Sequence, residues 1–171
     1  LGTKTGAIQL LSLASSEIME SQDDAHDGSV WSIVMRPDRT GFVSAGADKV
    51  VKFYEFDVAD GDGSTEGGQQ RLTFVHTRTL KMSDEVLSVR YSHAPGRPEK
   101  LLLAVALLDS TIKIFYDDTL KFHLSLYGHK LPVLSLDISS DDTLLVSASS
   151  DKDVKLWGLD FGDCHKSIFA H

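Results

Sequence analysis

Apolar residues in this chain alternate with polar ones or form short runs between turn residues, a pattern typical of β-strands rather than helices. The C-terminal part shows it most clearly, with strands expected at 133–138, 144–148, 154–157 and 165–169. Short connections, mostly rich in Ser, Asp and Gly, separate these strands. Strands joined so closely pair antiparallel, so the pattern predicts a four-stranded meander.

The same unit recurs earlier in the chain. One copy places strands at 30–34, 41–45 and 50–54, and a weaker copy places them at 86–91, 101–106 and 112–115. Residues 7–11 match the third strand of these copies. The pattern therefore predicts a partial unit at 1–24 and three further units at 25–81, 82–128 and 129–171.

Polar residues follow the repeat at a fixed spacing. In the last unit, Asp151 lies 22 residues after His129, and Trp157 lies 28 residues after it. Ser147 lies four residues before Asp151. The same spacing occurs in the unit at 25–81, in the residues His26, Ser44, Asp48 and Tyr54. Such a repeated long-range spacing indicates that one supersecondary unit has been copied.

Four-stranded units of roughly 40–45 residues resemble the blades of WD-repeat β-propellers. The resemblance rests on Gly128-His129, on 147–152 and on 154–157, and it covers nearly all of the chain. It implies an all-β fold of about three propeller blades plus a partial one. Because propellers usually have about four to eight blades, we expect the chain to be a segment of a larger propeller.

In the WD-repeat family, the His, Ser, Asp and Trp of one blade form a hydrogen-bonded structural tetrad. The resemblance implies one tetrad from His129, Ser147, Asp151 and Trp157, and a second from His26, Ser44, Asp48 and Tyr54, in which a phenol replaces the indole. The unit at 82–128 departs from the pattern. Its equivalent positions hold Met82, Val105, Asp109 and Phe115. Because only the aspartate remains, we expect that blade to depend on apolar packing.

Two insertions interrupt the repeat. Residues 57–70 are acidic and Gly-rich without periodicity, which predicts a loop. Residues 92–100 lengthen the connection between the first two strands of the next unit. Both connections leave the same face of a meander, so we expect the insertions to lie side by side, opposite the tetrad turns.

Composition narrows the class of protein. A net charge of −8 over 171 residues argues against a surface that binds nucleic acid everywhere. The single Cys164 excludes an internal disulfide framework. The longest apolar run, 101–108, is far shorter than the roughly 20 residues of a membrane helix, so we expect no membrane association.

Basic residues are scattered along the chain, and solvated strand faces are expected to account for most of them. They include Arg36, Arg39, Lys49, Lys52, Arg71, Arg78, Lys81, Arg90, Arg97 and Lys100. Arg71, Arg97 and Lys100 flank the two insertions, which makes them candidate contacts for RNA phosphates or for a protein partner.

The combination of Ser, His and Asp also occurs in hydrolases. Here the trio is present in two units and lacks a Gly-x-Ser-x-Gly elbow, so we expect no catalytic residues and no enzyme. Asp163-Cys164-His165 has no second ligand pair at metal-binding spacing, which favours an outer strand over a metal site. No cofactor is expected.

A closer resemblance lies in 151–167 and in the Ser-Leu-Tyr-Gly-His-Lys-Leu-Pro-Val segment at 125–133. These segments resemble the tandem-propeller WD-repeat subunits of the UTP-B module of the small-subunit processome, the Dip-two/WDR-three type. The resemblance implies a nucleolar, non-catalytic scaffold in 18S rRNA maturation, with other WD-repeat subunits and the U3 snoRNA and pre-rRNA particle as partners. The alternative is a substrate-recognition propeller, such as a ubiquitin-ligase receptor, and an enzyme comes third. The fold alone does not choose among them.

Overall fold

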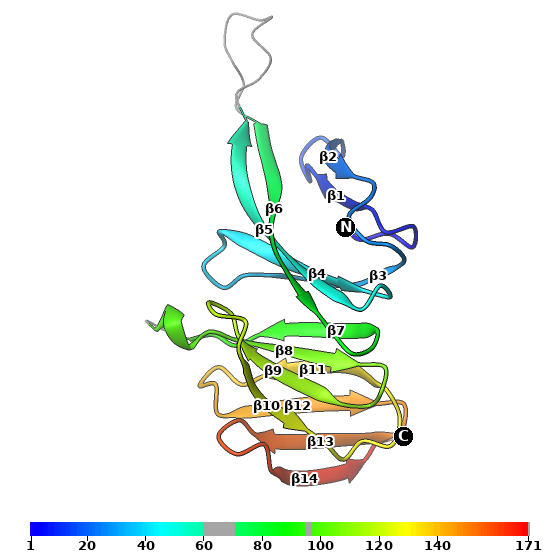
Figure 1. The fold of residues 1–171 in the computed structure, drawn as a ribbon, viewed down its shortest axis with the longest axis vertical. Coiled ribbons are helices and arrows are strands. Elements are labelled where there is room, and N and C mark those ends of the chain that lie inside the picture. The colour runs from blue at the N-terminus through cyan, green and yellow to red at the C-terminus, as the bar shows by residue number, and fades with distance from the viewer. Residues whose placement is uncertain (60–70, 95–96, 171) are drawn as a thin grey trace, which may run out of the picture.

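The computed structural model describes residues 1–59, 71–94 and 97–170. Their strands form three four-stranded antiparallel sheets and one two-stranded sheet (Figure 1). Each sheet is a meander in chain order and lies within one predicted unit. The all-β fold of propeller blades is therefore confirmed.

The strand bounds follow the turn residues. The two-stranded sheet contains β1 (Ile8–Leu11) and β2 (Ile18–Gln22). The next sheet contains β3 (Val30–Met35), β4 (Gly41–Gly46), β5 (Val50–Ala59) and β6 (Arg71–Lys81). The third contains β7 (Val86–Tyr91), β8 (Leu102–Leu107), β9 (Ile112–Tyr116) and β10 (Phe122–Leu126), with the 3-10 turn η1 (Pro98–Lys100) before β8. The last contains β11 (Val133–Ile138), β12 (Leu144–Ser149), β13 (Asp153–Gly158) and β14 (Cys164–Phe169).

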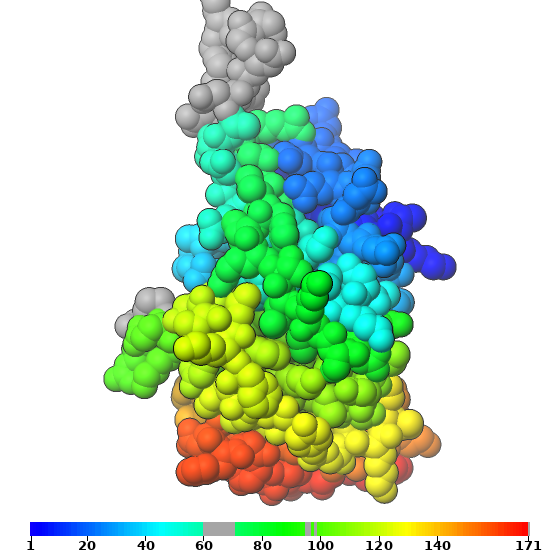
Figure 2. All heavy atoms as spheres, viewed as in Figure 1, coloured from blue at the N-terminus to red at the C-terminus, as the bar shows by residue number. Residues whose placement is uncertain are grey.

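The sheets are stacked in chain order along the molecule. Strand β3 contacts β7, and β7 contacts β11, so the first strand of each four-stranded sheet faces the first strand of the next. Figure 2 shows the same order on the surface, where the colours follow one another from the N-terminal to the C-terminal end. Neighbouring sheets therefore pack as neighbouring blades do.

The middle sheet is held by apolar contacts on both of its faces. Every residue of β8 is buried. Because side chains alternate along a strand, Leu103, Val105 and Leu107 join the core shared with β4 and β5, while Ala104 and Ala106 join the core shared with the last sheet. This double burial explains the apolar run at 101–108. Among the described residues, no helix is long and apolar enough to span a bilayer.

Strand β5 is longer than the sequence pattern predicts. The repeat pattern places the start of the insertion at residue 57, but Asp57 pairs with Thr73 and Val58 with Leu72, so β5 continues to Ala59. Cross-strand pairing with β6 extends the hairpin beyond the apolar pattern of the blade. Residues 60–70 and 95–96 lie outside the described residues, and the expected adjacency of the two insertions stays a prediction.

Candidate functional site

The last blade brings four polar side chains from separate strands and turns into one hydrogen-bonded chain. The indole N–H of Trp157, on β13, donates to Ser147 Oγ on β12 at 2.8 Å. The Ser147 hydroxyl donates to His129 Nε2 at 2.8 Å, and His129 Nδ1–H donates to Asp151 Oδ2 at 2.9 Å. The indole only donates and the carboxylate only accepts, so the imidazole between Ser147 and Asp151 donates through Nδ1–H and accepts at Nε2. Each of these four side chains thus has a hydrogen-bond partner for its buried polar group.

Asp151 anchors this tetrad in the turn between β12 and β13. Its carboxylate also accepts the backbone N–H groups of Lys130, at 2.9 Å, and Asp153, at 3.0 Å. Burial acts to raise the pKa of Asp151, but these N–H groups and His129 outweigh it and hold the pKa far below its usual range. The ionised carboxylate fixes the orientation of the imidazole.

Gly128 makes room for this arrangement. Its φ is +147°, and a Cβ there would lie 3.3 Å from the Trp157 ring. A glycine directly before the histidine therefore lets the backbone reach the indole without a clash.

The blade formed by β3–β6 has a serine, a histidine and an aspartate in the same arrangement. The Ser44 hydroxyl lies 2.6 Å from His26 Nε2, and His26 Nδ1 lies 2.9 Å from each Asp48 carboxylate oxygen. Burial lowers the pKa of His26, although Asp48 acts in the opposite direction. The Tyr54 ring stacks on Phe42 with a centroid separation of 4.9 Å. Tyr54 is therefore part of an aromatic core beside the His–Ser–Asp chain.

The middle blade has apolar groups at the equivalent positions. Val105 pairs with Lys113 across β8 and β9, as Ser147 pairs with Lys155 in the last blade. Val105 and Phe115 are buried. Asp109 instead caps its own turn, accepting the N–H of Thr111 at 3.0 Å and its hydroxyl at 2.6 Å. Val105 and Phe115 thus lie in an apolar core, where the last blade has a hydroxyl and an indole.

The His–Ser–Asp geometry resembles that of a hydrolase, but its surroundings differ. Ser44 is 0% exposed and Ser147 is 1% exposed, so neither hydroxyl is open to a substrate. Ser147 Oγ already accepts the Trp157 indole. Within the described part of the chain, no group of three or more His, Cys, Asp or Glu side chains is placed to hold a metal. The arrangement acts as an internal brace.

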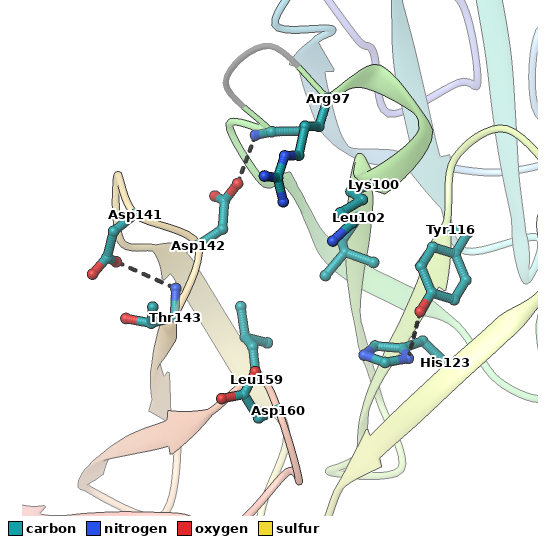
Figure 3. Close-up of a pocket in the computed structure, with 11 residues that line it drawn as sticks. Arg97, Lys100, Leu102, Tyr116, His123, Asp141, Asp142, Thr143, Leu159 and Asp160 are labelled. Carbon is teal, nitrogen blue, oxygen red and sulfur yellow. Dashed lines mark hydrogen bonds between the residues drawn. The ribbon is translucent and has the colours of Figure 1, made fainter.

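A cleft of about 630 Å³ lies between the third and fourth sheets (Figure 3). Its lining residues are Ala94, Arg97, Lys100, Leu102, Tyr116, His123, Asp141, Asp142, Thr143, Leu159 and Asp160. Two of the three predicted basic contact residues, Arg97 and Lys100, thus share one cleft. Arg71 begins β6 in another sheet and does not line it. Contact of any of the three with RNA or a partner stays a prediction.

Comparison with known proteins places this chain in a family. The model for the WDR3 second beta-propeller domain matches residues 1–171. The chain belongs to the WDR3 second-propeller family. Human (Homo sapiens) WD repeat-containing protein 3 is 56% identical over 133 residues, which is 78% of this chain and 13% of that protein.

Two yeast relatives of this WDR3-type propeller segment carry informative names. U3 small nucleolar RNA-associated protein 12 of Saccharomyces cerevisiae is 47% identical over 139 residues, or 80% of this chain and 14% of that protein. U3 small nucleolar RNA-associated protein 21 of the same yeast is 26% identical over 170 residues, or 99% of this chain and 16% of that protein. The chain therefore spans only a small part of each relative's length.

The structure of this WDR3-type segment also shows a buried carboxylate that the sequence pattern does not reveal. Asp117 lies between two blades, with Arg36 Nη2 3.0 Å from its Oδ2 and Arg78 Nη2 3.4 Å from its Oδ1. The Tyr91 hydroxyl donates to Asp117 Oδ1 at 2.8 Å. Burial, and then Asp117, raise the pKa of Tyr91 well above its usual range. Arg36 and Arg78 are thus partly buried against this carboxylate, with side chains that are 25% and 31% exposed.

Proposed function

We propose that the chain is a rigid, non-catalytic scaffold module of a small-subunit processome protein, which assembles with the U3 snoRNA and pre-rRNA particle for 18S rRNA maturation. Its place would be the nucleolus, and its partners other WD-repeat subunits of the same assembly. The observation that carries the proposal is membership in the WDR3 second-propeller family, together with 47% identity to a yeast protein named for association with U3 small nucleolar RNA.

The geometry supports a scaffold in two ways. The His–Ser–Asp groups brace single blades from within, and the doubly buried β8 and the Asp117 cluster join neighbouring blades into a firm body. The Ser, His and Asp groups that resemble a catalytic set are enclosed, so they serve the fold. Binding would then fall to the loops and clefts between blades, as in other proteins where a rigid framework presents its loops.

Affinity purification of the tagged full-length protein tests the proposal. We expect U3 snoRNA, pre-18S rRNA and other WD-repeat proteins in the eluate, and a loss of mature 18S rRNA without loss of large-subunit rRNA after depletion. A matched bait that lacks residues 1–171 should recover less of the particle. Recovery of ubiquitin-ligase subunits without U3 snoRNA or pre-rRNA would overturn the proposal in favour of a substrate-recognition propeller.

A further inference from the structure

We propose that the cleft between the sheet β7–β10 and the sheet β11–β14 binds an extended acidic peptide of a partner protein. The cleft measures about 630 Å³. It combines a cationic side, an apolar floor and an opposite side on which two of the aspartates already accept hydrogen bonds within the protein. The proposal concerns this cleft alone and does not depend on the ribosomal role.

The cationic side is formed by Arg97 and Lys100, at η1 and just before it. Figure 3 shows both side chains on the same side of the cleft, across from the turn that holds Asp141 and Asp142. Both residues are exposed, and neither side chain forms an ion pair with any residue that the structure describes. Two cations that face a cleft without a partner are suited to a ligand that brings carboxylates.

The two acidic residues across the cleft are already engaged. Asp142 accepts the backbone N–H of His93 at 2.7 Å and that of Ala94 at 2.6 Å. Asp141 accepts the Ser139 hydroxyl at 2.5 Å and the N–H of Thr143 at 3.2 Å. These hydrogen bonds hold the loops in place, and the ion pair that Asp142 forms is with His93 rather than with Arg97 or Lys100. Asp160 completes this side of the cleft.

The floor of the cleft is apolar with one polar pair. Leu102 and Leu159 are buried there and belong to the core between the two sheets. Beside them the Tyr116 hydroxyl lies 3.1 Å from His123 Nδ1. Side chains of an extended peptide point alternately to opposite sides. Acidic side chains could then reach Arg97 and Lys100 while the alternate apolar ones rest on the floor.

The shape of the cleft is set before any ligand arrives. The Asp142 carboxylate joins the turn of one sheet to the loop of the next through the N–H groups of His93 and Ala94. A cleft whose walls are tied together in this way loses little conformational freedom on binding. The cationic side and the apolar floor would therefore already be positioned for an extended peptide before it binds.

The same surroundings disfavour an RNA strand. Tyr116 is the only Phe, Tyr or Trp side chain in the lining, and its hydroxyl is engaged with His123, so a row of base-stacking aromatic rings is missing from this lining.

Fluorescence anisotropy with the full-length protein tests the proposal. The probe is a short, labelled peptide with blocked ends, in which glutamate and leucine alternate. We expect the double variant Arg97→Glu, Lys100→Glu to weaken binding by roughly tenfold or more, because each reversal replaces an attraction with a repulsion. Thr143→Trp, which fills the cleft and leaves both cations in place, should weaken binding similarly. The matched control Lys166→Glu, an exposed charge reversal on β14, should leave it unchanged.

Each contrary outcome has a definite meaning. Equal binding to the parent and to both cleft variants, or no binding to the parent, would overturn the proposal. Equal binding of a glutamine–leucine peptide would overturn the acidic specificity. Tight binding of a single-stranded RNA oligonucleotide that the same two variants abolish would assign the cleft to RNA instead. Circular dichroism and the melting temperature of each variant separate loss of binding from loss of fold.

Discussion

At the scale of single residues, the Ser147 hydroxyl has two buried partners. It accepts the Trp157 indole N–H and donates to His129 Nε2, each at 2.8 Å. Both partners lie where water does not reach them, since Trp157 is 1% and His129 is 9% exposed. Removing the hydroxyl would leave both nitrogen atoms without a hydrogen bond. Most of the loss in the free energy of unfolding would come from these two unpaired nitrogen atoms rather than from the missing oxygen itself.

The first prediction concerns this hydroxyl. Ser147→Ala should lower the free energy of unfolding by about 2–3 kcal/mol, because two buried polar groups lose their partner. Urea-induced unfolding of the chain measures the change. The control is Ser135→Ala in neighbouring β11, where the serine is exposed and little change is expected. Equal losses in the two variants would contradict the role assigned to Ser147.

The second prediction concerns pH. Burial lowers the pKa of His26, so the folded chain binds this proton less readily than the unfolded chain does. The resulting stabilisation is complete above the unfolded pKa of about 6.5 and is lost as the pH falls below it toward the folded value. Between about pH 7 and pH 5 the urea midpoint should therefore fall. His26→Gln should show a shallower fall over the same range, and identical slopes would refute this account.

At the scale of elements, neighbouring sheets are linked by contacts that do not belong to the repeated residue pattern. Asp117 is 1% exposed and interacts with Arg36 and Arg78 from the preceding blade. Arg78 also donates to the Asp117 carbonyl oxygen at 2.5 Å. The contact joins residues 39 positions apart. One buried carboxylate thus holds the degenerate blade, which lacks a tetrad, to its neighbour.

The third prediction tests this link. Asp117→Ala should destabilise the chain by about 3 kcal/mol, because Arg36 and Arg78 would lose a buried counter-charge while keeping some contact with water. Urea unfolding measures the loss. Asp118→Ala is the matched control, since Asp118 is adjacent and exposed. Similar stability of the two variants would show that the ion pairs contribute little.

An element could be predicted from the sequence where local residues determine it, and could not be where contacts between distant residues do. Strand order followed from local alternation and turn residues, as in β11, whose bounds Val133–Ile138 match the expected 133–138. The end of β5 depends on pairing with β6, which the apolar pattern does not record. The grouping of Arg36 and Arg78 around Asp117 depends on how two blades pack. No spacing in the sequence signals such a contact.

At the scale of the whole molecule, β8 connects cores on both sides of the middle sheet. Leu103 is 0% exposed and packs in the core shared with β4 and β5, while its neighbours Leu102 and Ala104 pack in the core shared with the last sheet. Loss of packing on one face of β8 should therefore be felt on the other. This coupling arises because propeller blades stack face to face.

The fourth prediction tests the coupling. Leu103→Ala should create a cavity that costs about 2–5 kcal/mol. Hydrogen exchange measured by mass spectrometry on the full-length protein should become faster in both β4 and β11, which contribute side chains to the two cores. Leu13→Ala, at a side chain that is 99% exposed, is the control and should leave exchange unchanged. Faster exchange confined to one neighbouring sheet would show that β8 does not transmit the loss.

The closing pair of the β5–β6 hairpin also makes this chain easy to engineer. Ala59 and Arg71 are partners across the hairpin, so the chain leaves the blade and re-enters it at adjacent points. A folded reporter or epitope spliced between them would meet closely spaced ends, and lengthening such a connection costs little entropy. The position is therefore suited to an internal label that leaves both chain ends free for assembly.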